Sequence, residues 1–95
     1  MQPKNQEDKN KKLLYKALAN AIKKHRNSLK KSIYKLSDEI ELDRSIWSRL
    51  ERVESLDPSF TTIWKIAEAL DIYPDELIRE VREKLGDDFS LSDLK

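Results

Sequence analysis

The chain has 95 residues, which is enough for one domain with a modest core and leaves little room for an enclosed catalytic cavity. It contains no cysteine and one histidine, so we expect no disulfide framework, no metal site and no cofactor. With a single glycine and many Leu, Ile, Lys and Glu residues, the composition favours an all-α fold. No apolar run reaches the roughly 18 residues of a membrane span, and the N-terminus lacks the apolar core of a secretory signal, so we expect a cytoplasmic protein.

The net charge of +1 conceals an uneven distribution along the chain. Residues 1–35 contain eleven Lys and Arg residues against two acidic ones, a net charge of +9. Residues 36–95 contain eight basic and sixteen acidic residues, a net charge of −8. This asymmetry suggests one face for an anionic partner, although a solvated Lys-rich helix would produce the same pattern.

The N-terminal third predicts a flexible segment followed by a helix. Residues 1–12 are polar and charged, and we expect them to form a flexible basic arm. A helix is predicted over residues 11–28, with an apolar stripe that includes Leu14, Leu18 and Ile22. His25 continues this stripe in a structural role, because no nucleophile or acid pattern of a catalytic site surrounds it.

The next stretch predicts two short helices that are separated by a break. Ser32 is a suitable N-cap for a helix through Leu36, but Ile40 and Leu42 are two residues apart, which breaks the helical spacing. Asp43 can then cap a new helix over residues 44–52. Two short helices joined by a three-residue turn form a helix-turn-helix, whose second helix fits the major groove of DNA.

Within this unit the residue types suit the two faces of the second helix. Small Ser37 lies where the helices must cross closely, and Trp47 and Leu50 are predicted to face inward. The polar and basic residues that face outward are Arg44, Ser45, Ser48 and Arg49.

Two further helices are predicted before the C-terminus. Pro58 ends a loop and Ser59 can cap a helix over residues 60–70. Pro74 stands at the first position of a fifth helix, which runs to a C-cap at Gly86. We therefore expect one domain over residues 13–86 and a loose tail over residues 87–95.

The stretch SIYKLSDEIELDRSIWSRLER, followed by PSFTTIWKIAEALDIYPDEL, resembles the phage-repressor (Cro/XRE) helix-turn-helix family over residues 18–78. The resemblance implies a five-helix domain with an internal ion pair between Arg26 and Glu51. A glycine that is common in the turn of the family is Glu41 here, and a non-glycine residue at a positive φ angle is strained, so we expect this turn to differ slightly. Two further common glycines are Val53, where the loop to Pro58 is one residue longer than typical, and Asp71, which tolerates a left-handed conformation better than most residues. A Gln that often contacts phosphate in the family is Ile33 here, so that contact is not expected.

The resemblance also implies double-stranded DNA as the partner. Arg44, Ser45, Ser48 and Arg49 would contact base edges, where Arg binds guanine O6 and N7. The implied phosphate contacts at the helix margins are Lys31, Ser32, Lys35 and Arg52. The alternative is an ordinary solvated helix face. Ile46 could contact a thymine methyl group or lie partly exposed, and Trp47 is expected to pack in the core.

The apolar stripe of the fifth helix continues past the point where the domain core needs it, through Val81 and Leu85. We expect a homodimer interface there, bordered by Trp64 and Tyr73, because a single helix-turn-helix contacts only a few base pairs. In the alternative arrangement this helix folds back over the first helix near residues 13–14.

Several functions are compatible with these features. A sequence-specific transcriptional regulator is the leading interpretation. The alternatives are an antitoxin with a toxin partner, a restriction–modification controller protein, and a protein-interaction module without DNA binding. The sequence contains no metal-ligand set, Gly-rich phosphate loop or nucleophile–base arrangement, so an enzyme is not expected. No ligand-binding domain is evident, so we expect no small-molecule effector.

Overall fold

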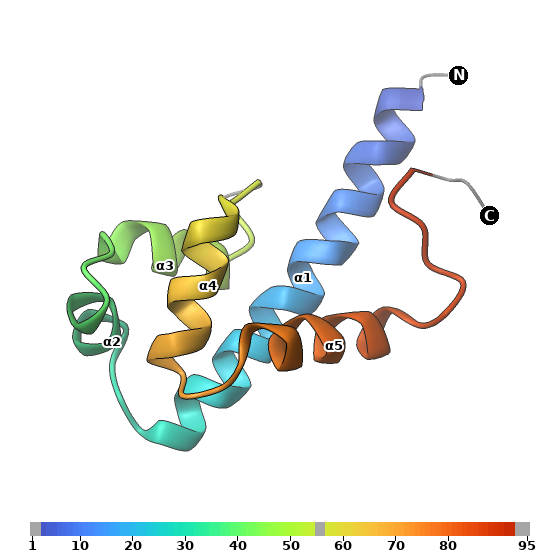
Figure 1. The fold of residues 1–95 in the computed structure, drawn as a ribbon. Helices are drawn as coiled ribbons and strands as arrows, with labels where there is room; N and C mark the ends of the chain where they lie inside the picture. The colour runs from blue at the N-terminus through green and yellow to red at the C-terminus, as the bar shows by residue number, and fades with distance from the viewer. Residues whose placement is uncertain (1–2, 55–56, 93–95) are drawn as a thin grey trace.

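The computed structural model describes residues 3–54 and 57–92, and within these ranges it contains five helices and no strand (Figure 1). The helices are α1 (Pro3–Leu29), α2 (Ile33–Glu39), α3 (Arg44–Glu51), α4 (Phe60–Ala69) and α5 (Pro74–Leu85). The predicted all-α architecture with five helices is therefore confirmed. In the described ranges, no helix has the combination of length and apolar character that crossing a bilayer requires.

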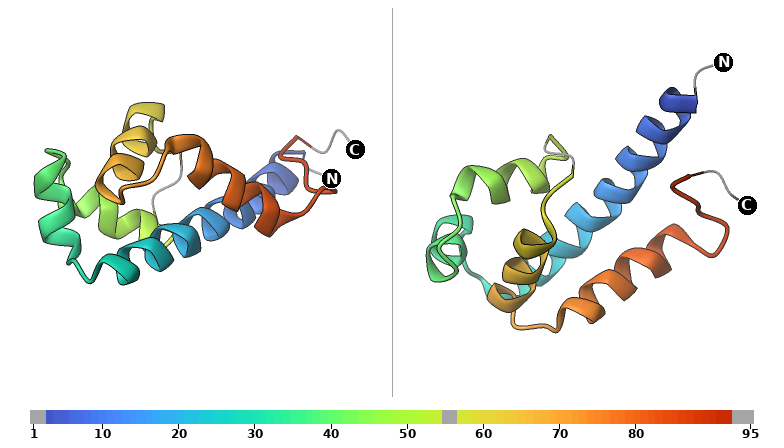
Figure 2. Two further views of the ribbon diagram at one scale, coloured as in Figure 1. Left: turned by 60° about the horizontal axis from the view of Figure 1, so that its bottom comes forward. Right: turned by 45° about the horizontal axis from the view of Figure 1, so that its top comes forward.

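The long helix α1 supports the rest of the domain. Both α3 and α5 pack against α1, while α2 packs against α3 and α4. Figures 1 and 2 show α2, α3 and α4 gathered around the C-terminal part of α1, whereas its first turns extend away from them beside the end of the described chain. The helix-turn-helix unit thus occupies one end of an elongated molecule that measures 44 × 23 × 20 Å.

The core receives fully buried side chains from all five helices. The largest apolar ones are Ile22, Leu36, Trp47, Leu50, Ile66 and Leu77. Burying a side chain of this size stabilises the fold by about 1.5–3 kcal/mol. The position predicted for Trp47 is confirmed, because its indole is completely buried at the centre of the domain.

The start of α1 corrects the predicted flexible arm over residues 1–12. The helix already begins at Pro3, a residue that suits the first helical position, and residues 1–2 lie outside the described ranges. The Asn10 side chain is buried, and its Nδ2 donates hydrogen bonds to the carbonyl oxygens of Ser90 (3.0 Å) and Leu91 (3.2 Å). These tertiary contacts, together with good helix formers, favour helix in a segment whose polar composition alone suggested a flexible chain.

The same hydrogen bonds correct the predicted loose tail over residues 87–95. Residues 87–92 form no helix, but the Asn10 side chain fastens the backbone at Ser90 and Leu91 to the first turns of α1. Residues 93–95 lie outside the described ranges.

Three helices end in the same way without glycine. Glu41 after α2, Val53 after α3 and Asp71 after α4 have φ angles of 53°, 57° and 63°. In each case the next amide closes a six-residue Schellman loop; the amide after Glu41, for example, donates to the Ser37 carbonyl at 2.9 Å. The positive φ angles at Glu41 and Asp71 agree with the expectation from the resemblance, whereas that of Val53 was not predicted. A side chain in this conformation costs about 1 kcal/mol relative to glycine.

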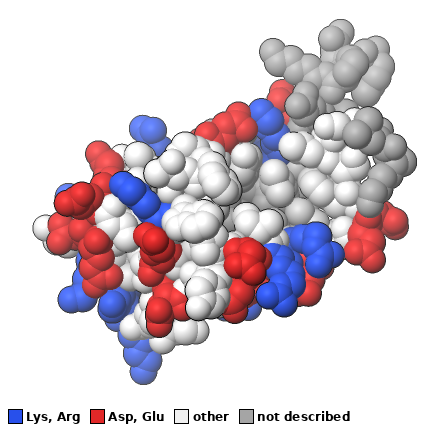
Figure 3. Space-filling model, viewed as in Figure 1, with Lys and Arg blue, Asp and Glu red and all other residues white. Residues whose placement is uncertain are grey.

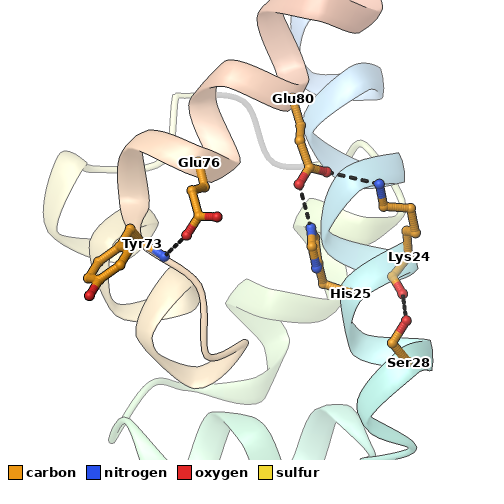
Figure 4. Close-up of polar contacts among 6 residues, drawn as sticks. All are labelled: Lys24, His25, Ser28, Tyr73, Glu76 and Glu80. Carbon is orange, nitrogen blue, oxygen red and sulfur yellow. Dashed lines mark hydrogen bonds and ion pairs between the residues drawn. The ribbon is translucent and has the colours of Figure 1, made fainter.

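Polar contacts join α1 to α5 on the edge of the core (Figure 4). The Glu80 carboxylate lies 2.8 Å from His25 Nε2 and 3.1 Å from Lys24 Nζ. Burial raises the pKa of Glu80, but the hydrogen bonds from His25 and Lys24 outweigh burial, so the pKa lies below its ordinary value. At the start of α5, the Tyr73 N–H donates to Glu76 Oε1 at 3.0 Å, which caps the helix. The contacts of Glu80 with His25 and Lys24 hold α5 along α1.

Candidate nucleic-acid interface

The turn between α2 and α3 sets the direction of α3. Glu41 adopts the left-handed conformation, and the Leu42 N–H donates to the Ser37 carbonyl, so the chain reverses within a few residues. Asp43 then caps α3, because its carboxylate accepts a hydrogen bond of 2.8 Å from the Ser45 backbone N–H. This hydrogen bond keeps the pKa of Asp43 below its ordinary value. The chain thus forms two short helices joined by a tight turn.

The two faces of α3 differ as the spacing predicted. Trp47 and Leu50 are buried on the inner face. Arg44, Ser45 and Arg49 are exposed on the outer face. Partly buried Ile46 packs against the core, which leaves little of it available for a thymine methyl group.

A buried hydrogen-bond network holds α3 on α1. Arg26 Nε donates to Glu51 Oε2 at 2.7 Å, and Arg26 Nη2 donates to Glu51 Oε1 at 2.8 Å. Trp47 Nε1 also donates to Glu51 Oε2, at 2.7 Å. The hydrogen bond to Glu51 raises the pKa of the Arg26 guanidinium. Since the Glu51 side chain is 6% exposed, these three hydrogen bonds are needed to compensate the buried charge.

The residues expected at phosphates lie at the margins of the same surface, and three of them are engaged within the protein. Lys31 pairs with Glu39 at 3.2 Å. The Ser32 hydroxyl accepts the Lys35 N–H at 3.1 Å and thereby caps α2. The Lys35 side chain is exposed.

Arg52, the fourth of these residues, caps the C-terminus of α3 and is held by two partners. Its guanidinium donates to Glu54 through two nitrogens, at 3.1 and 3.0 Å, and to the Ser48 hydroxyl at 2.7 Å. The hydrogen bonds with Glu54 raise the pKa of Arg52 and lower that of Glu54. Since this pair is exposed, water screens it strongly and a phosphate could replace the carboxylate.

An exposed aromatic ring lies next to the first residue of α3. The Arg44 guanidinium carbon is 4.9 Å from the centroid of the Tyr34 ring, which is a cation–π contact between α2 and α3. Tyr34 is 64% exposed and lies on the second position of α2. The sequence analysis did not single it out.

Residues 22–77 match the model of a helix-turn-helix family of the Cro/C1 type. The matched residues are more than half of the chain. The chain belongs to this helix-turn-helix family. No curated protein and no solved structure matches the chain significantly.

The family match confirms the resemblance drawn from the sequence motifs and covers the elements that form the candidate interface. It begins in the second half of α1, includes α2, α3 and α4, and ends in α5. Helix-turn-helix proteins of the Cro/C1 type are DNA-binding regulators. In the described part of the chain, no group of three or more metal-binding side chains is present.

Helix α5 corrects part of the expected dimer interface of this helix-turn-helix protein. Val81 is 4% exposed and belongs to the core, and Leu85 packs against the core. Leu14 of α1 packs against the same core cluster, and α5 lies along α1. The extended stripe is therefore covered by α1 of the same chain, as in the alternative arrangement, and Val81 is not available to a second copy.

The other two residues expected at the interface lie on an exposed apolar surface. Trp64 is 47% exposed and Tyr73 is 74% exposed. Phe60 and Ile78 join them at 76% and 49% exposure, and the Phe60 and Trp64 rings meet edge to face at 5.9 Å. We call these four residues the α4–α5 patch. Figure 3 shows uncharged surface in the region of α4, bordered by charged side chains.

Two features of the site were not found from the sequence. Trp47 was predicted as a core residue, but its hydrogen bond to Glu51 was missed; their spacing of four residues on one helix was the available signal. The contact of Tyr34 with Arg44 has no comparable local signal, because it depends on how α2 and α3 cross.

Proposed function

We propose that this helix-turn-helix protein is a sequence-specific transcriptional regulator that inserts α3 into the major groove of double-stranded DNA. The observation that carries the proposal is the outer face of α3, where Arg44, Ser45 and Arg49 are exposed while Trp47 and Glu51 anchor the inner face. Because α3 is already held in place, its hydrogen-bond donors lose little conformational entropy when they bind. In this proposal Arg44 and Arg49 contact guanine edges, and Ser45 and Ser48 contact neighbouring bases.

Phosphate contacts would surround this helix. Lys31, Ser32, Lys35 and Arg52 lie at the margins of α2 and α3 and would set the register on the duplex. Lys31 and Arg52 would exchange a carboxylate partner for a phosphate, which costs little because exposed ion pairs contribute only about 0–1 kcal/mol.

Binding measurements with two duplexes test this proposal. The probes are a duplex selected from a random pool by the parent protein and an unrelated duplex of equal length. We expect Arg44→Ala and Arg49→Ala each to weaken binding to the selected duplex by about 5–150-fold, as expected for loss of 1–3 kcal/mol of base discrimination, and to change binding to the unrelated duplex much less. Lys16→Ala, which removes an exposed charge from α1, is the matched control.

Salt dependence separates this function from that of an interaction module. Affinity for the selected duplex should fall steeply as salt rises, because phosphate contacts release counterions. The proposal would be contradicted if the parent selected no duplex from the random pool. It would also be contradicted if Arg44→Ala and Arg49→Ala both bound the selected duplex with the parent's affinity.

We further infer that two copies pair through the α4–α5 patch, so that two α3 helices contact two half-sites of a palindromic operator. Trp64 lies between two surface pockets of opposite character. The charged residues of one are Arg79, Arg82 and Asp75, which leaves it net positive, and those of the other are Glu68, Asp71 and Glu76. In a two-fold arrangement the basic pocket of one copy can face the acidic pocket of the other, and the exposed aromatic rings become buried.

The oligomeric state tests this pairing. Light scattering of the parent should give a dimer that Trp64→Glu and Ile78→Glu convert to a monomer. Leu13→Glu, at a similarly exposed apolar residue on α1, is the control and should leave the dimer intact. A parent chain that stays monomeric at high micromolar concentration, alone and on a palindromic duplex, would contradict it.

A further inference from the structure

The contact between Tyr34 and Arg44 joins the two helices of the helix-turn-helix at its outer surface. Arg44 is the first residue of α3, and its guanidinium carbon lies 4.9 Å from the centre of the Tyr34 ring. Both side chains are exposed, and Tyr34 does not belong to the core cluster. The pair therefore contributes little to the packing of the domain, and its position suggests a role at the surface.

A positive side chain is poorly placed at the start of a helix. The unpaired N–H groups of the first turn create a positive end of the helix dipole, so the Arg44 charge is unfavourable there. The negative face of an aromatic ring offsets part of this cost. It also restricts a long side chain that would otherwise sample many rotamers.

Stacking on a ring leaves the hydrogen-bonding edge of a guanidinium available. The Arg44 guanidinium carbon lies over the Tyr34 ring, 4.9 Å from its centroid. A guanidinium that lies flat on a ring keeps its N–H donors free, because they point outward in its own plane. Two of these donors can bind guanine O6 and N7 while the face stays on the ring. Contact with Tyr34 and contact with a base are therefore compatible in one side-chain conformation.

We propose that Tyr34 is a positioning residue that holds Arg44 in the conformation that recognises guanine. This inference rests on the proposed function of α3 as the helix that contacts bases. The ring lowers the conformational entropy that Arg44 loses on binding, so Tyr34 sets the preference for guanine at one base pair without contacting that base.

Four variants test the inference on the duplex that the parent selects from a random pool. These are Tyr34→Leu, which removes the ring, Tyr34→Phe, which keeps it, Arg44→Ala, and Arg44→Ala combined with Tyr34→Leu. For each variant, affinity is measured on the selected duplex, on duplexes changed at single guanines, and on an unrelated duplex. Thermal unfolding of each variant checks that the fold is kept. We expect it to be kept, because the substituted side chains are exposed.

We expect Tyr34→Leu to lose about two- to fivefold of the discrimination at the guanine that Arg44→Ala also affects, as expected for an exposed cation–π contact. Tyr34→Phe should keep the parent's preference. In the Arg44→Ala background, Tyr34→Leu should have no further effect, because the partner of the ring is absent. Binding to the unrelated duplex should stay at the parent value, and the melting temperature should fall by no more than a few degrees, as expected for loss of an exposed cation–π contact.

Three outcomes would overturn the inference. One is Tyr34→Leu with the parent's base preference, and another is equal loss with Tyr34→Phe, which would assign the effect to the hydroxyl group. The third is an additive effect in the double variant. If Arg44→Ala loses discrimination and Tyr34→Leu does not, only this inference fails. If Arg44→Ala itself binds like the parent, the base contact proposed for Arg44 fails as well, and the proposed role of α3 fails if Arg49→Ala does the same.

Discussion

Glu51 on α3 and Arg26 on α1 form a two-pronged ion pair inside the domain, with both nitrogen–oxygen distances below 3 Å. The pair links the long helix to the helix proposed to contact DNA. Because Trp47 donates to the same carboxylate, one acidic residue determines the position of α3 on the core.

Removal of this carboxylate should destabilise the fold. In Glu51→Ala, the Arg26 charge and the Trp47 N–H lose their partner in a largely buried place, so we expect the free energy of unfolding to fall by about 2–3 kcal/mol. Glu54→Ala is the control, since its carboxylate pairs with Arg52 at the surface. Chemical denaturation measures both, and equal stability of Glu51→Ala and the parent would contradict the role given to this pair.

A glycine at Val53 should stabilise the protein. Val53 is β-branched and has a φ angle of 57°, a conformation that glycine adopts without steric cost. We expect Val53→Gly to raise the free energy of unfolding by about 1 kcal/mol. Asp71→Gly, at an equivalent helix end, should gain less because aspartate tolerates this conformation better. Thermal unfolding that ranks the two variants in the opposite order would refute the assignment of strain.

Ser37→Ala is expected to be stabilising as well. The Ser37 hydroxyl on α2 is buried and has no hydrogen-bond partner among the described residues. Replacing it with a methyl group removes an uncompensated polar atom and improves helix propensity, for a gain of about 1 kcal/mol. Ser37→Val, which adds volume at a close helix crossing, should be destabilising. A loss of stability in Ser37→Ala would indicate that the hydroxyl has a partner.

The contacts of Glu80 should make stability depend on pH in the acidic range. Its folded pKa lies below the ordinary value of 4.5, so the charged form contributes stability above that pH and loses it as the pH falls through the folded pKa. Glu80→Gln should therefore be less stable than the parent at neutral pH, and the difference should shrink below about pH 4.5. Denaturation of both proteins across this range tests the sign. A difference that stays constant with pH would exclude the ionised carboxylate as its source.

The helix boundaries of this fold could be predicted in large part from residues close to them in the sequence. The N-caps Ser32, Asp43 and Ser59 mark three helix starts, because a side-chain oxygen must accept an amide hydrogen bond there. The turn at Glu41 is predictable because two apolar residues break the helical period. In both cases the cause lies within a few residues of the feature.

The features that were not predicted depend on contacts between distant residues. The helix at the start of α1 is supported by the hydrogen bonds of Asn10 with residues some 80 positions away. The burial of Val81 depends on how α5 packs along α1, and the sequence left open whether α1 or a second copy covers it. The pairing of Tyr34 with Arg44 requires the crossing of two helices. A periodic pattern shows that a side chain will be covered, but it does not show which element covers it.

The hydrogen bonds from Asn10 to the backbone at Ser90 and Leu91 make the two ends of the described chain one cooperative unit. The part of α1 that carries Leu18 and Ile22 is held by the core and should exchange its amide hydrogens only on global unfolding. The turns around Asn10 lie outside the core cluster and are held by the tail and by contacts such as the ion pair of Lys11 with Asp57 at 2.9 Å. Their amide hydrogens should therefore exchange by a sub-global opening that breaks these contacts and leaves the helix-turn-helix folded.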